Sequence, residues 1–255
     1  MKKIPFQIGD RLIGEEFPPF VMAEVGINHE GDFEKALQMV DAASVAGADC
    51  VKFQCHITEA EMIPTDMTPG KISEERLWDI IKRCELNEDE ERQVQAYCEE
   101  KGILYLCTPF SREAVDRLEE MGVSAYKIGS GECNNLPLLD HVARKRKPVI
   151  LSTGMNDIHS IRKSVNLLSE HGVQLALMHC TSLYPTPYDM VRLGAIRKLQ
   201  EEFQLPVGLS DHSLGIYTSL GAVALGACIL EKHFTVFKWS ICPQMGFSCS
   251  AGQLK

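Results

Sequence analysis

The chain has 255 residues, of which 45% are hydrophobic, and 26 basic against 35 acidic side chains give a formal net charge of −9. This length and composition predict one globular domain, residues 1–255, large enough to bury a full core. The acidic balance argues against binding to nucleic acid or to an anionic membrane surface. No apolar run has the length of a signal peptide or of a membrane span, which predicts a cytoplasmic protein that uses no membrane.

The ten cysteines predict reduced core thiols rather than disulfides or a zinc site. No two of them are separated by just two residues, the spacing of common zinc sites. Several lie within apolar runs, where a free cysteine behaves as a small buried hydrophobe. These are Cys55, Cys107, Cys180 and Cys228.

The first predicted element is a β-hairpin within residues 1–17. Phe6–Gln7 and Leu12–Ile13 flank the turn-like stretch Ile8-Gly9-Asp10-Arg11. We expect this hairpin to close the floor of the structure that follows.

The rest of the chain repeats one pattern, in which a segment with helical periodicity is followed by a glycine and a short apolar run. A glycine suits the left-handed residue that closes a helix, and the apolar runs suit strands buried on both faces. The glycines of this pattern are Gly47, Gly102, Gly122, Gly172 and Gly226. The pattern therefore predicts an alternation of strands and helices.

Apolar stripes at helical spacing predict the helices. These begin near Phe33 behind an Asp32 cap, cover Glu75–Cys84 and Glu88–Glu100, and include the stripes that start at Ile158 and Ile196. The stretch Thr58–Ser73 is predicted to be irregular.

One polar or charged residue stands near the end of each predicted strand. These residues are Glu24, Lys52, Thr108, Lys127, Ser152, His179, Ser210 and His233. Eight strands with short crossovers predict an α/β fold of the (β/α)8 TIM-barrel class, in which the chemistry lies at the C-terminal ends of the strands. The rival fold, a doubly wound open sheet, would need a glycine-rich phosphate loop after the first strand, and Val25–His29 does not supply one.

Two of the strand-end residues, Lys52 and Lys127, follow apolar strand residues. A buried ammonium is costly unless an anion meets it. A structural ion pair or a Schiff-base lysine would account for either residue alone. Hydroxyl groups at other strand ends favour a site for phosphate and carboxylate groups instead. These are Thr108, Ser130, Ser152 and Ser210.

Two histidines, His212 and His233, lie at neighbouring predicted strand ends. Together they predict a site for one divalent cation, with Mn²⁺ or Mg²⁺ favoured over Zn²⁺ if water and oxygen ligands complete the shell. Glu24 is a carboxylate at the same rim, and its role as a base, as a hydroxyl-orienting group or as a partner of Lys52 is left open.

The strand-end segments, in unbroken order from about Pro18 to Thr235, resemble the successive motifs of the sialic acid synthase family. The segments are Ala23–His29, Val51–Gln54, Thr108–Ser111, Tyr126–Glu132, Leu151–Met155, His179–Pro185, Gly208–His212 and Glu231–Thr235. Members of that family make N-acetylneuraminate, legionaminate or pseudaminate, and relatives act in spore-coat polysaccharide synthesis.

The resemblance implies a homodimeric enzyme that condenses phosphoenolpyruvate with an N-acetylmannosamine-type sugar and water, releasing phosphate and a nonulosonic acid. It implies that the divalent metal polarises the open-chain aldehyde, that the enol carbon attacks it, and that water adds before phosphate leaves. It implies catalytic roles for Glu24, His212 and His233. The phosphoenolpyruvate site that the resemblance implies is Lys52, Thr108, Lys127, Ser130, Ser152 and Ser210. The implied sugar contacts are Glu24, Gln54 and Tyr184. The implied metal ligands are His212 and His233.

This chain departs from the family pattern at Ser182, where several members carry Asn, and in the tail, residues 236–255. The family's Gly-Pro-Asp segment aligns with Cys242-Pro243-Gln244, and a glutamine carries no negative charge near neutral pH. A local shift of reading frame would explain the altered stretch.

The sequence ends where the family begins its last barrel helix and its antifreeze-like domain. That domain gives an Arg to the sugar pocket of the partner subunit. We therefore expect the chain to bind phosphoenolpyruvate and metal better than it turns over sugar. One alternative is a related synthase acting on phosphorylated aldoses, which would need a second phosphate site. Another is an inactive remnant that serves as a binding or assembly module.

Overall fold

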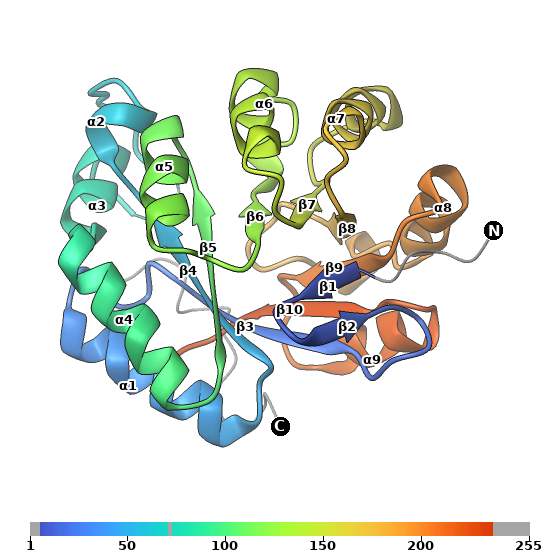
Figure 1. Cartoon of the computed structure of the whole chain (residues 1–255), viewed down its shortest axis with the longest axis horizontal. Helices are drawn as coiled ribbons and strands as arrows, with labels where there is room; N and C mark the ends of the chain where they lie inside the picture. Colours follow the sequence, from blue (N-terminus) through green and yellow to red (C-terminus); the bar gives the residue numbers. More distant parts are fainter. Residues whose placement is uncertain (1–5, 71–72, 237–255) are drawn as a thin grey trace. The chain divides into compact units, whose positions relative to one another are not determined.

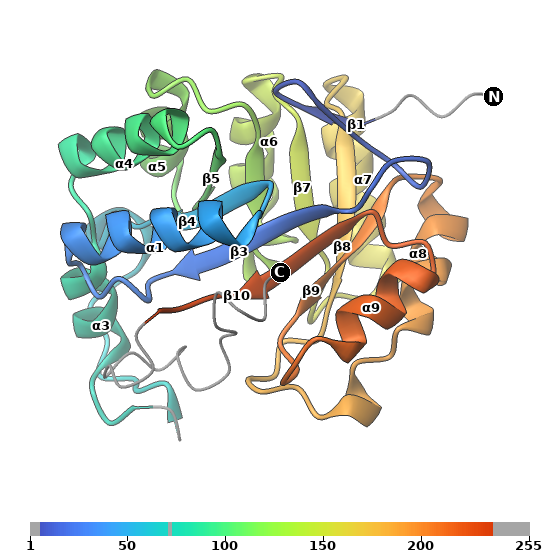
Figure 2. The same cartoon turned by 90° about the horizontal axis from the view of Figure 1, so that it is seen from below.

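The computed structural model describes residues 6–70 and 73–236 (Figures 1 and 2). Contacts along the chain divide it into two compact units. The 23–123 unit also contains residues 233–236, and the 124–232 unit also contains residues 6–22. Each unit consists of buried strands that alternate with helices along the chain. The predictions for residues 237–255, including the aligned Cys242-Pro243-Gln244 segment, lie outside the described residues.

The 23–123 unit contains three strands in the order β5-β4-β3. They are β3 (Phe20–Gly26), which enters this unit at Ala23, β4 (Cys50–Cys55) and β5 (Leu104–Pro109). Strands β4 and β5 are parallel, with Lys52 opposite Leu106 and Gln54 opposite Thr108. Almost every residue of these strands is buried, which explains their continuous apolar runs.

The α-helices of the 23–123 unit within the described residues number five. They are α1 (Phe33–Ala46), α2 (Thr58–Glu61), α3 (Leu77–Cys84), α4 (Glu88–Glu100) and α5 (Arg112–Glu120). As predicted, the Asp32 side chain caps α1 by accepting a hydrogen bond from the backbone of Lys35. The helix predicted from Glu75 begins at Leu77, because Arg76 has an extended backbone.

In the described part of the 124–232 unit, five parallel strands follow the order β10-β9-β8-β7-β6. They are β6 (Tyr126–Ile128), β7 (Val149–Ser152), β8 (Leu175–Cys180), β9 (Val207–Asp211) and β10 (Ile229–His233), which ends at the first residue assigned to the other unit. Its helices are η2 (Ser130–Glu132), α6 (Leu136–Arg144), α7 (Ile158–Glu170), η3 (Tyr188–Met190), α8 (Gly194–Phe203) and α9 (Tyr217–Ala224).

The glycines predicted to close helices all have a left-handed backbone. Their φ angles lie between 67° at Gly102 and 93° at Gly226. Residues with a side chain rarely adopt this backbone conformation, so the glycine at each of these positions allows the chain to leave a helix and enter the next strand. The predicted alternation of strands and helices, with one of the expected polar residues in each strand after the hairpin, is confirmed within the described residues. The stretch Thr58–Ser73 was predicted to be irregular, but its first residues form the short helix α2.

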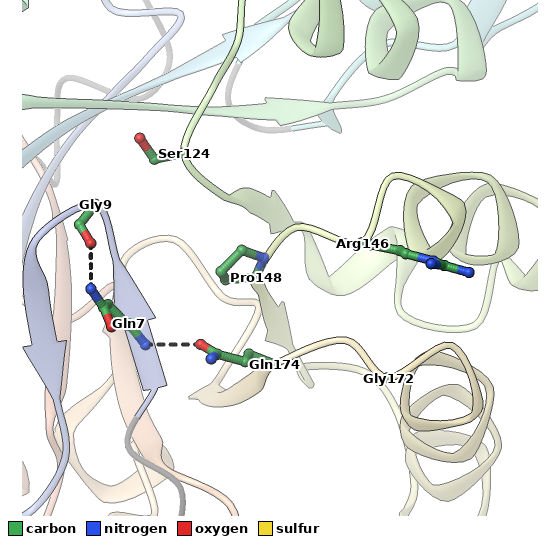
Figure 3. Close-up of a pocket in the computed structure, with 7 residues that line it drawn as sticks. All are labelled: Gln7, Gly9, Ser124, Arg146, Pro148, Gly172 and Gln174. Atoms are coloured by element: carbon green, nitrogen blue, oxygen red, sulfur yellow. Dashed lines mark hydrogen bonds between the residues drawn. The ribbon is translucent and has the colours of Figure 1, made fainter.

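The predicted hairpin is formed by β1 (Phe6–Ile8) and β2 (Arg11–Ile13), which pair antiparallel. It lies beside the N-terminal ends of strands in its own unit, where the backbone amide of Gln7 donates to the Gln174 side chain over 3.1 Å (Figure 3). A cavity of about 380 Å³ lies between the hairpin and the segments that precede β6, β7 and β8. Its lining is Gln7, Gly9, Ser124, Arg146, Pro148, Gly172 and Gln174.

This cavity is not the predicted site, because it adjoins the N-terminal ends of the strands. The basic group nearest to it, the side chain of Arg146, points away from Gln7 and Pro148 (Figure 3). In barrels of this class the N-terminal end contributes to stability rather than to chemistry.

The cysteines within the described residues are all buried and free, as the sequence predicts. Burial raises the pKa of four of these thiols, those of Cys55, Cys98, Cys107 and Cys133, to about 12 at Cys98 and about 11 at Cys133. They therefore act as small apolar groups in the core.

Candidate active site

The 23–123 unit places a buried lysine at the centre of a cluster of strand-end side chains. Lys52 of β4 forms an ion pair with Glu24 of β3, with 2.6 Å between Nζ and Oε2. The same ammonium donates a 3.0 Å hydrogen bond to the Thr108 hydroxyl of β5. The three residues are at most 3% exposed, so the carboxylate offsets the cost of burying the ammonium. Glu24 is thus a partner of Lys52, which was one of the roles left open by the sequence.

Gln54 and His56 extend this cluster along β4 and just beyond it. Gln54 Nε2 donates to Glu24 Oε1 over 3.3 Å, and Gln54 Oε1 lies 3.0 Å from His56 Nε2. Four predicted residues of this unit therefore form one continuous set of polar contacts, which runs from Thr108 through Lys52 and Glu24 to Gln54.

The 124–232 unit holds a second buried lysine in a similar setting. Lys127 of β6 donates a 2.8 Å hydrogen bond to the Ser152 hydroxyl at the end of β7. Its Nζ lies 3.4 Å from one carboxylate oxygen of Glu231 in β10, and the other oxygen accepts a 2.5 Å hydrogen bond from the Ser210 hydroxyl. This unit therefore gathers one ammonium and two hydroxyls of the expected anion site, with Glu231 balancing the ammonium charge.

Ser130 lies beside a close approach of the backbone at Gly154. The Gly154 amide donates to Ser130 Oγ over 3.1 Å. A Cβ atom at position 154 would lie 2.8 Å from that hydroxyl and 2.7 Å from Ser182 Oγ, closer than real Cβ atoms come. Only glycine fits here, and it lets backbone and hydroxyl donors meet at one point, which is an arrangement suited to an anion.

His212 lies just after β9 and is held on both ring nitrogens. Its Nδ1 lies 2.9 Å from the Thr181 carbonyl oxygen, and its Nε2 lies 3.4 Å from Ser210 Oγ. The Tyr184 ring packs against it with 4.0 Å between ring centroids. Burial lowers the pKa of His212, but contacts with Cys180, the Thr181 carbonyl and Glu231 raise it above its ordinary value.

The loop that carries His212 is anchored by a buried carboxylate, Asp211. Its oxygens accept hydrogen bonds from the backbone and hydroxyl of Ser213 and from the Thr218 hydroxyl, and Lys232 Nζ lies 3.0 Å away. Burial raises the pKa of Asp211, but Lys232 and the hydroxyls lower it below its ordinary value. Asp211 thus fixes the start of the loop without being one of the predicted site residues.

Comparison with known proteins identifies the family. The NeuB family model matches residues 39–255, which is most of the chain. The chain belongs to the NeuB family.

Relatives of this NeuB-family chain agree with that result. An uncharacterized protein of Methanocaldococcus jannaschii is 43% identical over all of this chain and 73% of its own length. The N,N'-diacetyllegionaminic acid synthase of Campylobacter jejuni is 39% identical over 92% of this chain and 73% of its own length.

A solved structure of the same family confirms the fold class. The N-acetylneuraminic acid synthetase of Leptospira borgpetersenii matches with a TM-score of 0.90 and 33% identity, covering 98% of this chain and 85% of that one. The fold class is therefore the predicted (β/α)8 TIM barrel.

In this NeuB-family chain, His212 has the geometry of a histidine that can bind a metal. In the neutral ring, the backbone carbonyl that faces Nδ1 keeps the proton on that nitrogen and leaves Nε2 with a lone pair. Within residues 6–70 and 73–236, no three His, Cys, Asp or Glu side chains form a group that could hold a metal by themselves. A metal at His212 would need oxygen ligands from water or substrate, which Mn²⁺ and Mg²⁺ accept.

His233 ends β10, is 6% exposed and belongs to the 23–123 unit, whereas His212 belongs to the other one. Their pairing around one cation therefore stays a prediction. The same holds for the meeting of the Lys52 cluster with the Lys127 cluster in a single site.

Three side chains of these clusters were not assigned a role from the sequence of this NeuB-family chain. His56 follows Gln54 by two residues, and residues two apart on an extended chain share a face, so this spacing was a usable signal. Glu231 directly precedes Lys232 in a strand-end motif, but its pairing with Lys127 depends on the three-dimensional packing of β10. Asp211 gave no signal beyond its position beside His212.

Proposed function

We propose that this NeuB-family chain condenses phosphoenolpyruvate with an N-acetylmannosamine-type sugar and water, giving a nonulosonic acid and inorganic phosphate. In this reaction C3 of phosphoenolpyruvate bonds to the aldehyde carbon of the sugar, water adds at C2, and the C2–O bond to phosphate breaks. The names of its relatives support this class of product, because they include synthases of N,N'-diacetyllegionaminic acid and of pseudaminic acid.

The observation that carries the proposal is the pair of buried lysines, each bonded to a hydroxyl of the next strand. Lys52 donates to Thr108, and Lys127 donates to Ser152. An ammonium and a hydroxyl side by side match the oxygens of a phosphate or a carboxylate. We assign phosphoenolpyruvate to these residues together with Ser130 and Ser210.

In the absence of an anion, the charges of these lysines are balanced by glutamates. Lys52 pairs with Glu24, and Lys127 lies 3.4 Å from Glu231. When phosphoenolpyruvate binds, its negative charges stabilise the same ammonium groups. Glu24 then becomes available to the sugar, which we place against Glu24, Gln54 and Tyr184.

We assign a divalent cation, Mn²⁺ or Mg²⁺, to His212 and His233. Such a cation supplies Lewis-acid polarisation of the sugar carbonyl when it is bound. The contact between His212 Nδ1 and the Thr181 carbonyl orients the ring so that Nε2 is the ligating atom.

The proposal includes a homodimer and a cytoplasmic location. The helices of the described residues include none with the length and hydropathy of a membrane span.

Phosphate release tests this proposal. The chain is incubated with phosphoenolpyruvate and Mn²⁺, with N-acetylmannosamine, its diacetylated analogue or a phosphorylated aldose as acceptor. We expect phosphate to be released only when an unphosphorylated N-acetylated sugar is present. Release that requires the phosphorylated aldose, or no release with any acceptor in an assay where an active family member turns over, would contradict the proposal.

Two variants test the assigned residues. His233→Ala should abolish metal-dependent phosphate release, and Lys127→Met should raise the KM for phosphoenolpyruvate by about ten-fold or more, the loss expected for a bond to a charged group. Lys198→Met, an exposed residue of α8, is the matched control and should behave as the wild type. Full turnover by the His233 variant would remove that residue from the proposed metal site.

A further inference from the structure

Two side chains that follow β4, those of His56 and Glu61, continue the series of polar contacts that begins at Glu24 and Gln54. Gln54 donates from Nε2 to Glu24 and presents Oε1 to His56 Nε2 at 3.0 Å. His56 Nδ1 in turn lies 2.9 and 3.0 Å from the two carboxylate oxygens of Glu61. All four residues belong to the 23–123 unit, and none of them has an exposed side chain.

The direction of each hydrogen bond in this series follows from the first. Glu24 is ion-paired with Lys52, so its oxygens act as acceptors. Gln54 must therefore turn its NH₂ group toward Glu24, which leaves its carbonyl oxygen facing His56. Because that oxygen can only accept, His56 Nε2 must be the donor.

The other ring nitrogen of His56 also faces an acceptor. The Glu61 carboxylate receives Nδ1, and the two side chains are 4% and 5% exposed. The geometry therefore gives each ring nitrogen of His56 an oxygen acceptor, the Gln54 carbonyl at Nε2 and the Glu61 carboxylate at Nδ1. The Phe110 ring stacks on one face of the imidazole at 4.5 Å with an angle of 12° between the planes, while the hydrogen bonds at both nitrogens orient the ring.

The position of Glu61 is set by the chain that directly follows β4. Glu61 is the last residue of α2, a short helix that begins at Thr58. Both the backbone amide and the hydroxyl of Thr58 donate to Glu85, which holds α2 against the end of α3. The carboxylate that balances His56 is thus delivered by a short, anchored segment.

We propose that His56 and Glu61 form a positioning pair for the sugar site. Because His56 donates to the Gln54 carbonyl oxygen, the Gln54 carboxamide can adopt only the orientation in which its NH₂ group donates to Glu24. This hydrogen bond keeps Glu24 in place when Lys52 binds the anion instead of Glu24. This inference rests on the proposed function, in which Gln54 and Glu24 face the sugar. It predicts that loss of the pair impairs the use of sugar and spares the binding of phosphoenolpyruvate.

The first experiment compares two variants that separate hydrogen bonding from packing. His56→Phe keeps a ring against Phe110 but removes both donors, and should lower kcat/KM for the sugar about ten-fold or more, as expected for a hydrogen bond to a charged partner. The KM for phosphoenolpyruvate should change by less than about two-fold. Phe110→Leu removes the stacking partner and leaves every hydrogen bond, so its kcat/KM for the sugar should stay near the wild-type value. Equal losses in the two variants would show a packing role and overturn the inference.

A double-mutant cycle tests whether His56 acts through Gln54. If it does, His56→Phe should have no further effect on kcat/KM for the sugar in a Gln54→Ala background. Thermal unfolding of each variant is measured alongside, and the comparison uses variants that unfold as cooperatively as the wild type. Independent, additive losses would contradict the proposed positioning role.

A spectroscopic measurement separates this inference from the proposed function. In protein labelled with ¹⁵N at histidine, the signal absent from His56→Phe identifies His56, and under the conditions of the activity assay both of its ring nitrogens should donate, as the two hydrogen bonds require. A neutral ring with one protonated nitrogen would overturn the inference even if the enzyme is active. If the wild type releases no phosphate but the doubly protonated ring is observed, the proposed function fails while the hydrogen-bond assignment holds.

Discussion

At the scale of single residues, His29 is a buried imidazole held in its neutral form. It is 1% exposed, and its Nδ1 accepts a 3.1 Å hydrogen bond from the Gly31 amide, which requires an unprotonated nitrogen. Burial, helped by the nearby His56 charge, lowers the pKa of His29 from 6.5 to about 4. Protonation of this ring is therefore coupled to unfolding.

This coupling predicts a dependence of stability on pH. Above pH 6.5 the His29 ring is neutral in both the folded and the unfolded state. As the pH falls toward 4, the unfolded chain binds a proton at this ring, whereas the folded chain does not. The free energy of unfolding should thus decrease by roughly 3 kcal/mol over this range because of His29. Urea unfolding of the wild type and of His29→Gln, measured from pH 7 to pH 4, gives this contribution as the difference between the two curves. Parallel curves would contradict it.

The sequence was enough to predict that Lys52 and Lys127 are buried ammonium groups that need an anion, because each follows apolar strand residues. The anions that balance these lysines were predicted less well. Glu24 was one of the options for Lys52, whereas Glu231 was not assigned to Lys127. The reason is that period-two alternation reveals which face a side chain occupies but not which strand lies opposite. Glu61 was unpredictable because its approach to His56 depends on the turn after β4.

At the scale of elements, helix ends are specified by local hydrogen bonds. The start of α4 is a capping box, in which the Asn87 side chain accepts from the Glu90 amide and the Glu90 carboxylate accepts from the Asn87 amide. This arrangement satisfies two backbone donors that the helix cannot.

Asn87→Ala should therefore reduce the free energy of unfolding by about 1 kcal/mol. Asn87 is exposed and far in sequence from the proposed site residues, so the variant should keep its rate of phosphate release. Glu99→Ala, an exposed substitution near the other end of α4, is the control and should change stability by less than about half of that amount. Equal effects at both ends of the helix would argue against the cap.

Strand β9 contains a glycine that packing requires. A Cβ atom at Gly208 would lie 2.4 Å from the backbone oxygen of Ile229 and 2.6 Å from Met178 Sδ, so it would press on the neighbouring strands β10 and β8. The sequence displays this glycine within a motif, but its steric role follows only from the approach of three strands.

Gly208→Ala should destabilise the protein by about 1–3 kcal/mol or more, because β9 cannot move away from both neighbours at once. Because β9 carries Ser210 and leads to His212, the variant should also weaken metal-dependent phosphate release. Gly194→Ala, at a glycine of α8 where a Cβ meets nothing within 4 Å, is the matched control. A Gly208 variant as stable as the wild type would show that the strands can separate locally.

At the scale of the whole molecule, the hairpin β1–β2 contributes large buried side chains to its unit. Phe6, Ile8 and Ile13 are at most 2% exposed, whereas Gln7 between them is exposed. The alternation places the apolar residues on the covered face of the hairpin. The hairpin therefore stabilises the 124–232 unit by covering the region beside the N-terminal ends of its strands.

Ile8→Ala should reduce the free energy of unfolding by about 2–5 kcal/mol, the range for truncating a buried aliphatic side chain. Gln7→Ala is the control; it retains the backbone amide that donates to Gln174 and should change stability little. Chemical unfolding measures both. A loss at Ile8 no larger than that at Gln7 would indicate that the hairpin is peripheral to stability.

The order of strands and helices over the described residues was predictable, because each strand after the hairpin carries one of the expected polar residues and several helices begin with a cap or end at a glycine. The division into two compact units was not, since nothing in composition changes at Ala23 or Ser124. The single-domain organisation stays a prediction, as does the role of the tail, residues 236–255.

The buried thiols give this protein a built-in set of probes for local opening. Cys55 and Cys107 lie in the strands of one unit, and Cys228 adjoins β10 in the other, and all three are at most 2% exposed. A thiol reacts with an alkylating reagent as a solvent-accessible thiolate, so reaction at each position requires the surrounding strands to part first. Alkylation rates followed residue by residue would therefore rank the strands by how often they open, without introducing any label into the chain.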